Sequence, residues 1–194
     1  MSEVKLGCSL IHRFKYNFTE EYIKTIVGKL KFASIPLETG VAASSVNDLD
    51  CKPHEIEENA DFLKWLNEKV REVFIDWEYP SRLPYYFYNS WANVHHKTGQ
   101  TEEHNHALTN MVVSCYLKCP ENSGNILFRD PIHDYRSMEP IMSGSNPWRE
   151  IKVTTGDVLI FPGWLYHKTQ PSSIDESRIV CTYNIKTDFQ INTI

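Results

Sequence analysis

The sequence predicts an α+β protein in which helices pack against a rolled antiparallel sheet or barrel. Helical periodicity is concentrated in residues 1–80, whereas residues 81–190 consist of short β-branched and aromatic runs separated by turn residues. Helices followed by a series of antiparallel strands are typical of this class. The length of 194 residues suits one domain. We therefore expect a single domain over 1–194, with a helical N-terminal part (1–80) and a β-barrel core (81–190).

Composition narrows the function classes. The net charge is −5 and no dense cluster of Lys and Arg occurs, so we expect no nucleic-acid partner. The five cysteines include no Cys-x-x-Cys pair, which predicts reduced thiols rather than a disulfide framework or a zinc site. No signal-like segment or apolar run of about 20 residues occurs, so we expect a cytoplasmic protein without a membrane partner. Nothing in the sequence indicates an oligomeric state.

Two segments of the N-terminal part have helical character. Thr19 is a suitable N-cap for TEEYIKTIVGKLKF, which has acidic residues in its first turn. Between Glu55 and Trp77, apolar residues recur at steps of three and four and form one stripe, which we expect to pack against the sheet. The stripe consists of Phe62, Leu63, Leu66, Val70, Val73, Phe74 and Trp77.

The C-terminal part contains the candidate strands, separated by turns such as ENSG and TTGD. The runs are YYFYNSWANVH, LTNMVVSCYLK, NILFRD, IKVTT, DVLIFPGWLYH and SRIVCTYNI. The segment SMEPIMSGSNPWRE has the composition of one long loop.

Two histidines stand two residues apart in TEEHNHALTN. In an extended strand, His104 and His106 would point to the same face and aim at one point inside a barrel. Neutral imidazole is a common ligand of zinc, copper, iron and nickel. The alternative is a polar, solvated loop, since His95 and His96 lie nearby and are expected at the surface.

His167 and Arg178 strengthen the metal hypothesis. His167 ends the apolar run GDVLIFPGWLYH, and Arg178 follows it after eleven positions in a run with buried character. A buried guanidinium requires an anionic partner. A structural salt bridge or the carboxylate of a ligand would meet that requirement.

The order of these residues resembles that of the Fe(II)/2-oxoglutarate-dependent oxygenases. Residues 88–185 are most similar to a small phage and bacterial group of 2-oxoglutarate-Fe(II) oxygenases. The matching pieces are SWANV, HNH, CYLKCPENSGNILFRDP, GDVLIFPGWLYHKTQP and ESRIVCTYNI. The resemblance implies a double-stranded β-helix, a jelly-roll or cupin-like barrel, and an enzyme that uses Fe(II), 2-oxoglutarate and O2. A phage-encoded enzyme would act in the host cytoplasm.

The resemblance also assigns site residues. It gives His104 and His167 as metal ligands and Arg178 as the anchor of the 2-oxoglutarate carboxylate. In most of the superfamily, two histidines and one Asp or Glu hold the metal. His106 falls at the position of that Asp or Glu, and we expect it to be the third ligand of the catalytic triad. Glu102 and Asp130 stay open as carboxylate alternatives.

Further residues are candidates for the pocket around the metal. Tyr116 and Asn110 share strand parity with His106, and Tyr116 is a candidate for binding 2-oxoglutarate if it is not simply core. Thr182 shares a face with Arg178 and is a second candidate for binding 2-oxoglutarate. Asn93 is a third, because Trp91 and Asn93 resemble the Trp-x-Asn pair of the family. Aromatic side chains are expected to keep the site dry. They are Trp91, Tyr116, Phe161 and Trp164.

The sequence therefore predicts a non-haem Fe(II)- and 2-oxoglutarate-dependent dioxygenase that hydroxylates an unidentified peptidyl or small-molecule substrate and releases succinate and CO2. One rival is a cupin-type metal enzyme that does not use 2-oxoglutarate. It predicts that Arg178 is salt-bridged within the protein. A second rival is a non-catalytic β-barrel binding protein with solvated histidines.

Overall fold

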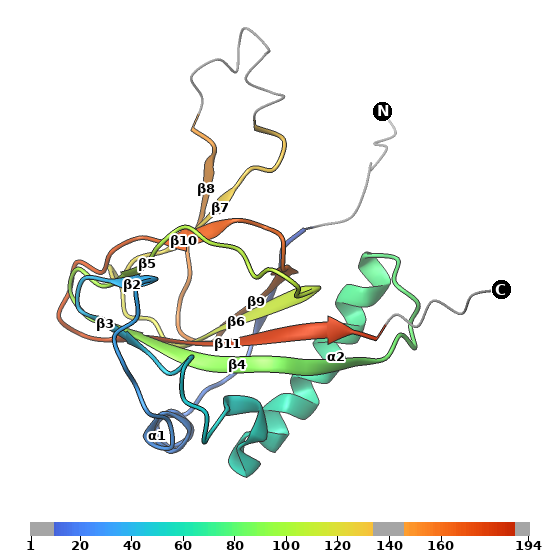
Figure 1. Cartoon of the computed structure of the whole chain (residues 1–194), viewed down its shortest axis with the longest axis horizontal. Helices are drawn as coiled ribbons and strands as arrows, with labels where there is room; N and C mark the ends of the chain where they lie inside the picture. Colours follow the sequence, from blue (N-terminus) through green and yellow to red (C-terminus); the bar gives the residue numbers. More distant parts are fainter. Residues whose placement is uncertain (1–9, 134–145, 189–194) are drawn as a thin grey trace, which may run out of the picture.

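A six-stranded antiparallel sheet forms the centre of the protein, as the computed structural model of residues 10–133 and 146–188 shows (Figure 1). Its order is β1 (His12–Lys15), β9 (Asp157–Pro162), β6 (Met111–Lys118), β11 (Arg178–Thr187), β4 (Tyr85–His95) and β3 (Ala42–Ser44). A second sheet has the order β10 (His167–Thr169), β7 (Ile126–Arg129) and β8 (Trp148–Ile151). A third consists of β2 (Glu38–Thr39) and β5 (Gln100–Thr101).

The central strands are buried on both faces, so their alternate residues enter two different cores. In β6, Val113 and Cys115 join the core beneath the main sheet, whereas Val112 and Tyr116 join the core between the main and second sheets. In β11 the same alternation directs the face of Arg178 toward the second core. The functional face of the main sheet is therefore the one that the second sheet covers.

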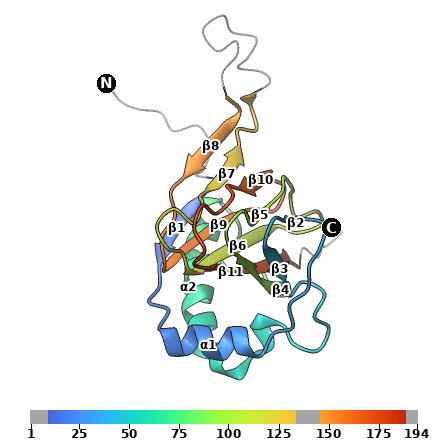
Figure 2. The same ribbon diagram turned by 90° about the vertical axis from the view of Figure 1, so that its left-hand side faces the viewer.

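Two α-helices lie outside the barrel, α1 (Glu20–Gly28) and α2 (Ala60–Asp76). The Thr19 side chain accepts the Tyr22 amide at 3.1 Å, which confirms the predicted N-cap. The stripe on α2 packs on the outer face of the main sheet, as predicted, and Figures 1 and 2 show α2 crossing beneath the strands. The helix begins later than predicted, because two short 3₁₀ turns occupy Pro53–Glu55 and Glu57–Asn59.

Several strand predictions need correction. The N-terminal part contains β1, β2 and β3 as well as helices, and β1 forms an edge of the main sheet. Strand β8 covers Trp148–Ile151 instead of IKVTT, so the end of the segment predicted as one long loop pairs with β7 in a hairpin that projects from the barrel (Figure 2). Residues 134–145 of the same region lie outside the described part of the chain.

The predicted turns contain the left-handed backbone that tight reversals require. Asn122 in ENSG has φ 64° and Gly156 in TTGD has φ 88°. These turns lie between consecutive strands of the chain, at β6–β7 and β8–β9. They confirm that Gly and Asn mark chain reversals here.

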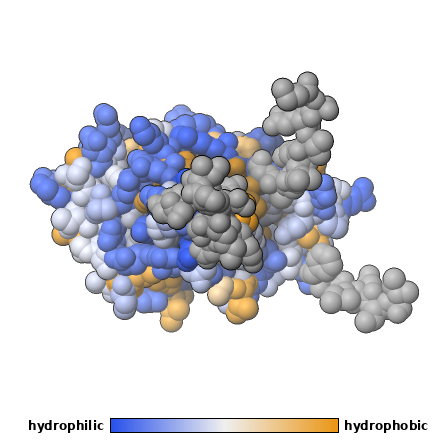
Figure 3. All heavy atoms as spheres, turned by 90° about the horizontal axis from the view of Figure 1, so that it is seen from above, coloured by the Kyte–Doolittle hydropathy of each residue, from blue (hydrophilic) through white to orange (hydrophobic). Residues whose placement is uncertain are grey.

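The part of the face seen from above that grey atoms leave visible carries mostly hydrophilic side chains, with small separate apolar patches (Figure 3). Within residues 10–133 and 146–188, no helix combines the length and apolar character needed to cross a membrane. Cys115, Cys119 and Cys181 are buried free thiols, as expected, and Cys51 is free and half-buried. Cys8 lies outside the described residues.

Candidate metal centre

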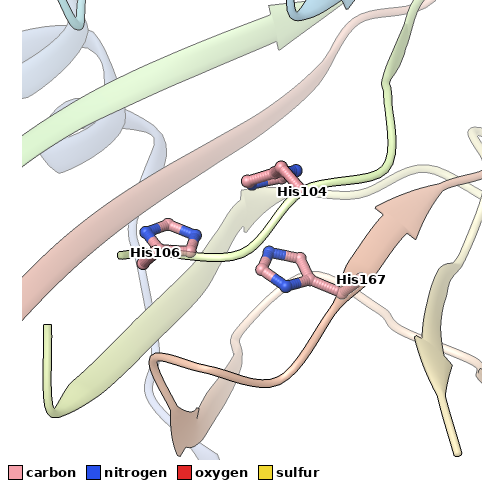
Figure 4. Close-up of side chains that lie close together, drawn as sticks. All are labelled: His104, His106 and His167. Carbon is pink, nitrogen blue, oxygen red and sulfur yellow. The ribbon is translucent and has the colours of Figure 1, made fainter. Parts of the chain in front are cut away.

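Three histidines from two segments lie close together (Figure 4). His104 and His106 lie in the loop after β5, and His167 is the first residue of β10. The amide of His104 donates to the carbonyl of His167 at 3.0 Å, and the reverse bond is 2.9 Å. The His106 amide donates to the Gly163 carbonyl at 2.8 Å. As a result, one ring nitrogen from each histidine lies within 4.8 Å of the other two.

The strand predicted for His104 and His106 is wrong. β5 ends at Thr101, and the two histidines follow in a loop in which only His104 forms an isolated antiparallel bridge, to His167. The loop then reverses through Leu108, whose φ is 63°. The rings meet because backbone bonds to the His167 segment hold the loop, not because strand alternation places both on one face.

Each of the three rings has a fixed tautomer. Nδ1 of His104 lies 2.8 Å from the Glu102 carbonyl oxygen, and Nδ1 of His167 lies 2.9 Å from the Leu165 carbonyl oxygen. Nδ1 of His106 lies 2.7 Å from the side-chain oxygen of Asn184. These oxygens only accept, so Nδ1 carries the proton and donates in each ring. Each Nε2 consequently carries a lone pair that is available to a metal.

Burial keeps the three rings neutral. Desolvation, together with the nearby His104, lowers the pKa of His106 to about 3. Desolvation and the other two histidines hold the pKa of His167 well below its usual value. Desolvation also lowers the pKa of His104, an effect that the Glu102 carbonyl and the charge of Glu38 partly oppose. Neutral imidazole is the form that binds transition metals, so the donor set fits an ion such as Fe(II), Ni(II) or Zn(II).

Neither carboxylate alternative belongs to this group. The Glu102 side chain is exposed and accepts hydrogen bonds from Thr39 and Gln100 at 2.8 and 2.9 Å. Asp130 accepts the Ile132 amide at 3.1 Å and lies 3.5 Å from the guanidinium of Arg149. In the described residues, the cluster with metal-binding spacing therefore consists of three histidines without a carboxylate.

Aromatic rings surround the histidines in part as predicted. Trp91 stacks on His106 with ring centroids 5.7 Å apart, and Phe161 packs edge-on against His167 at 4.9 Å. Trp164 is a correction, because it is 52% exposed and the neighbouring Leu165 is the buried residue of this turn. The backbone bond that holds the turn, from the Leu165 amide to the Pro162 carbonyl, directs Trp164 outward.

A narrow cavity of about 60 Å³ adjoins the three histidines. Of the predicted pocket residues, Trp91, Asn93, Tyr116 and Thr182 line it. Asn110 does not, because it is exposed and lies before β6, where its side-chain oxygen accepts the Thr187 amide at 3.0 Å. The strand parity that suggested an inward Asn110 fails because β6 begins one residue later.

Arg178 is fully buried but lies behind the cavity wall. Its Nη1 donates to the carbonyls of Ser123 and Gly124 at 2.7 and 2.9 Å, and Nη2 donates to the Thr169 hydroxyl at 3.0 Å. Nε is buried without a partner. Among the described residues no carboxylate lies within ion-pair distance of this guanidinium. Thr169 lines the cavity and so connects Arg178 to it.

A buried polar network in the cavity wall was not predicted from the sequence. The Glu38 carboxylate accepts from the Asn93 amide at 2.8 Å and from the Thr101 hydroxyl at 3.0 Å, and it also contacts Nε2 of His95. The expectation of His95 at the surface is wrong, because its side chain is 1% exposed, whereas His96 is exposed as expected. Pairing of β2 with β5 creates the network by placing Glu38 opposite Thr101. No local pattern signals a two-residue strand.

The sequence matches the model of a known family. Residues 89–184 match a family model described as "Putative 2OG-Fe(II) oxygenase". No protein of curated function matches the sequence significantly.

Solved structures share the fold at low sequence identity. HygX from Streptomyces hygroscopicus, with nickel and 2-oxoglutarate bound, is 13% identical over 94% of this chain and 84% of its own, with a TM-score of 0.65. A Pseudomonas putida prolyl-4-hydroxylase is 10% identical over 93% of this chain and 94% of its own, with a TM-score of 0.60. The α-ketoglutarate-dependent epimerase SnoN from nogalamycin biosynthesis is 12% identical over 91% of this chain and 77% of its own, also with a TM-score of 0.60. The barrel is accordingly a double-stranded β-helix, as predicted.

Proposed function

The chain belongs to the 2OG-Fe(II) oxygenase superfamily, and on that basis we propose that it is an Fe(II)- and 2-oxoglutarate-dependent dioxygenase that hydroxylates a peptidyl or small-molecule substrate. Its metal ligands are His104, His106 and His167. Succinate and CO2 are the products released from the co-substrate.

One observation carries this proposal: three neutral imidazoles with oriented lone pairs meet beside a cavity. Histidines placed at random on a surface are solvated, and nothing fixes the tautomers of all three. Buried rings that each donate through Nδ1 are expected of metal ligands with supporting hydrogen bonds. The second rival, a binding protein with solvated histidines, does not account for this arrangement.

When bound, Fe(II) with 2-oxoglutarate and O2 supplies the oxidising chemistry, and the chain supplies position and exclusion of water. His104, His106 and His167 would hold the ion, and the cavity that adjoins them would give the co-substrate access to it. Trp91 and Phe161 shield two of the rings. Tyr116, Thr182 and Asn93 line the space in which the co-substrate would lie.

Arg178 is the proposed anchor of the far carboxylate of 2-oxoglutarate. In its support, the guanidinium is buried, has no carboxylate partner among the described residues, and keeps an unpartnered Nε. Leaving such a charge without a counter-ion is costly, and an anionic ligand would remove that cost. The cupin-type rival predicts a salt bridge at this position, which the described residues do not contain. Thr169 stands between Arg178 and the cavity. The guanidinium can therefore reach the ligand only if the Thr169 side chain moves aside or binds the same ligand.

The type of reaction, hydroxylation, is the more specific part of the proposal. Hydroxylation is supported by likeness to a prolyl-4-hydroxylase, whereas the likeness to SnoN shows that the same fold also supports epimerisation. The cavity of about 60 Å³ beside the histidines limits the size of a group that can enter without displacing side chains.

Succinate formation tests the proposal without knowledge of the substrate. The wild-type protein with Fe(II), 2-oxoglutarate and O2 is expected to release succinate slowly, and His167→Ala is expected to abolish it. His96→Ala removes an exposed histidine and serves as the matched control, with wild-type turnover. Iron binding without any succinate would favour the cupin-type rival, and absence of both would favour the binding protein.

A further inference from the structure

The proposed metal site has an unbalanced charge. Its three ligands are neutral, so a bound divalent ion would bring two positive charges into a cavity whose walls include Ile35, Leu37 and Val180. Transfer of an ion from water to such surroundings is costly unless an opposite charge lies nearby. The exposed Glu102 lies outside the cavity, so the compensating charge must come from elsewhere.

Glu38 lies where it can supply the compensating negative charge. It is 5% exposed and lines the same cavity as the three histidines. The two other buried acids of the described residues have different partners. Asp157 pairs with Arg13 and Lys15, and Asp48 accepts backbone amides. Glu38 is thus the buried acid that faces the proposed metal.

The surroundings of Glu38 fix its position. The Asn93 amide and the Thr101 hydroxyl donate to it, and the ring of His95 contacts its second oxygen. Among the described residues no Lys or Arg lies within ion-pair distance of Glu38, so neither type of cation compensates its negative charge by direct pairing. Its field reaches both His104 and Arg178.

We propose that Glu38 is the outer carboxylate of the metal site, a positioning residue that supplies from the cavity wall the negative charge that the three-histidine ligand set lacks. This inference rests on the proposed function, because it requires a metal at the histidines. The hydrogen-bonded wall of Asn93, His95 and Thr101 holds the charge in place without letting it become a ligand. The stabilisation of the bound ion by Glu38 is electrostatic and should be greater for Fe(III) than for Fe(II).

Metal affinity tests the inference directly. The Ni(II) affinity of untagged Glu38→Gln, measured by calorimetry, is expected to fall roughly tenfold below that of the wild type, the loss typical when support outside the ligand shell is removed. The midpoint potential of bound iron should rise, because loss of a negative charge disfavours Fe(III). Glu72→Gln removes an exposed acid of α2, which does not line the cavity, and should leave both values unchanged.

A charge-swap variant separates charge from packing. The double variant Glu38→Gln/Asn93→Asp exchanges the carboxylate and the amide of this pair. One amide and one carboxylate stay in contact, and the negative charge returns to the same cavity wall. Its Ni(II) affinity is expected to lie within about threefold of the wild type, and this variant also covers the case in which Glu38→Gln does not fold. A purely structural role predicts instead that Glu38→Gln lowers the apo-protein melting temperature and leaves Ni(II) affinity unchanged.

Two results would overturn the inference alone. Wild-type affinity in folded Glu38→Gln would do so while leaving the proposed function intact. Failure of the swap to restore affinity, with its apo-protein folded, would do so as well. Absence of Ni(II) binding by the wild type would remove the proposed function and this inference together.

Discussion

At the scale of the residue, each histidine of the proposed metal site depends on the atom that holds its second nitrogen. The sequence predicted His104, His106 and His167 as ligands because histidines in that order belong to a known pattern. It did not reveal their supports, since two are backbone carbonyls and the third is Asn184, which is 78 positions from His106. Backbone acceptors have no residue identity and are invisible in a sequence.

Asn184 allows this dependence to be measured. Asn184→Ala removes the acceptor of the His106 Nδ1 proton, so the ring can turn or change tautomer, and metal affinity should fall by about 10- to 100-fold. Asn184→Asp keeps an acceptor oxygen at the same place and should restore most of the affinity. Calorimetric titration of both apo-proteins with Ni(II) gives the comparison. Equal affinities in the two variants would show that the hydrogen bond has no role.

At the scale of the element, regular strands could be predicted and irregular connections could not. The alternation in β6 and β11 follows from period-two burial, so Tyr116, Thr182 and Arg178 were expected on the inner face. The histidine loop follows no such period. It is fixed by contact with the turn after β9, where Gly163 allows two backbones to approach closely.

Gly163 is the point at which that contact can be broken. A Cβ at this position would lie 2.1 Å from the Thr109 carbonyl oxygen, so Gly163→Ala must push the His106 loop away. We expect weaker Ni(II) binding and a lower melting temperature. Gly28→Ala is the matched control, because no atom lies within 4 Å of its added Cβ, and its metal affinity should be unchanged. Wild-type affinity in folded Gly163→Ala would mean that the loop position does not depend on this contact.

At the scale of the whole molecule, the barrel brings together segments that are distant in sequence. The α+β class and its outer helix follow from local periodicity and from the order of helices and strands. The wall of Glu38, Asn93, His95 and Thr101 does not, because it forms where the two-residue strands β2 and β5 pair. Strands that short carry no periodic signal, and their pairing is decided by the rest of the fold.

Burial of the histidines has a consequence for the stability of the metal-free protein. The unfolded chain binds protons on histidine near pH 6.5, whereas the pKa of His106 is about 3 in the folded state and that of His167 is also well below the usual value. The unfolded state therefore binds more protons below pH 6.5, and the free energy of unfolding should fall as pH decreases.

The slope of that loss is the measurable quantity. Between pH 6 and 5, each of these two histidines should contribute about 1.4 kcal/mol per pH unit at most, by linkage. Urea unfolding of the apo-protein at several pH values gives the slope, and folded His106→Gln should reduce it. An unchanged slope in that variant would show that His106 protonates in the folded state much as it does in the unfolded chain.

The most direct test of the central claim is an anaerobic titration of the apo-protein with Fe(II) and then with 2-oxoglutarate, followed by visible spectroscopy. A weak charge-transfer band is expected only when both are present. It should be absent in His167→Ala, weakened in Arg178→Ala and unchanged in His96→Ala. Iron binding without a band would contradict the use of 2-oxoglutarate, and no iron binding at all would contradict the three-histidine metal centre itself.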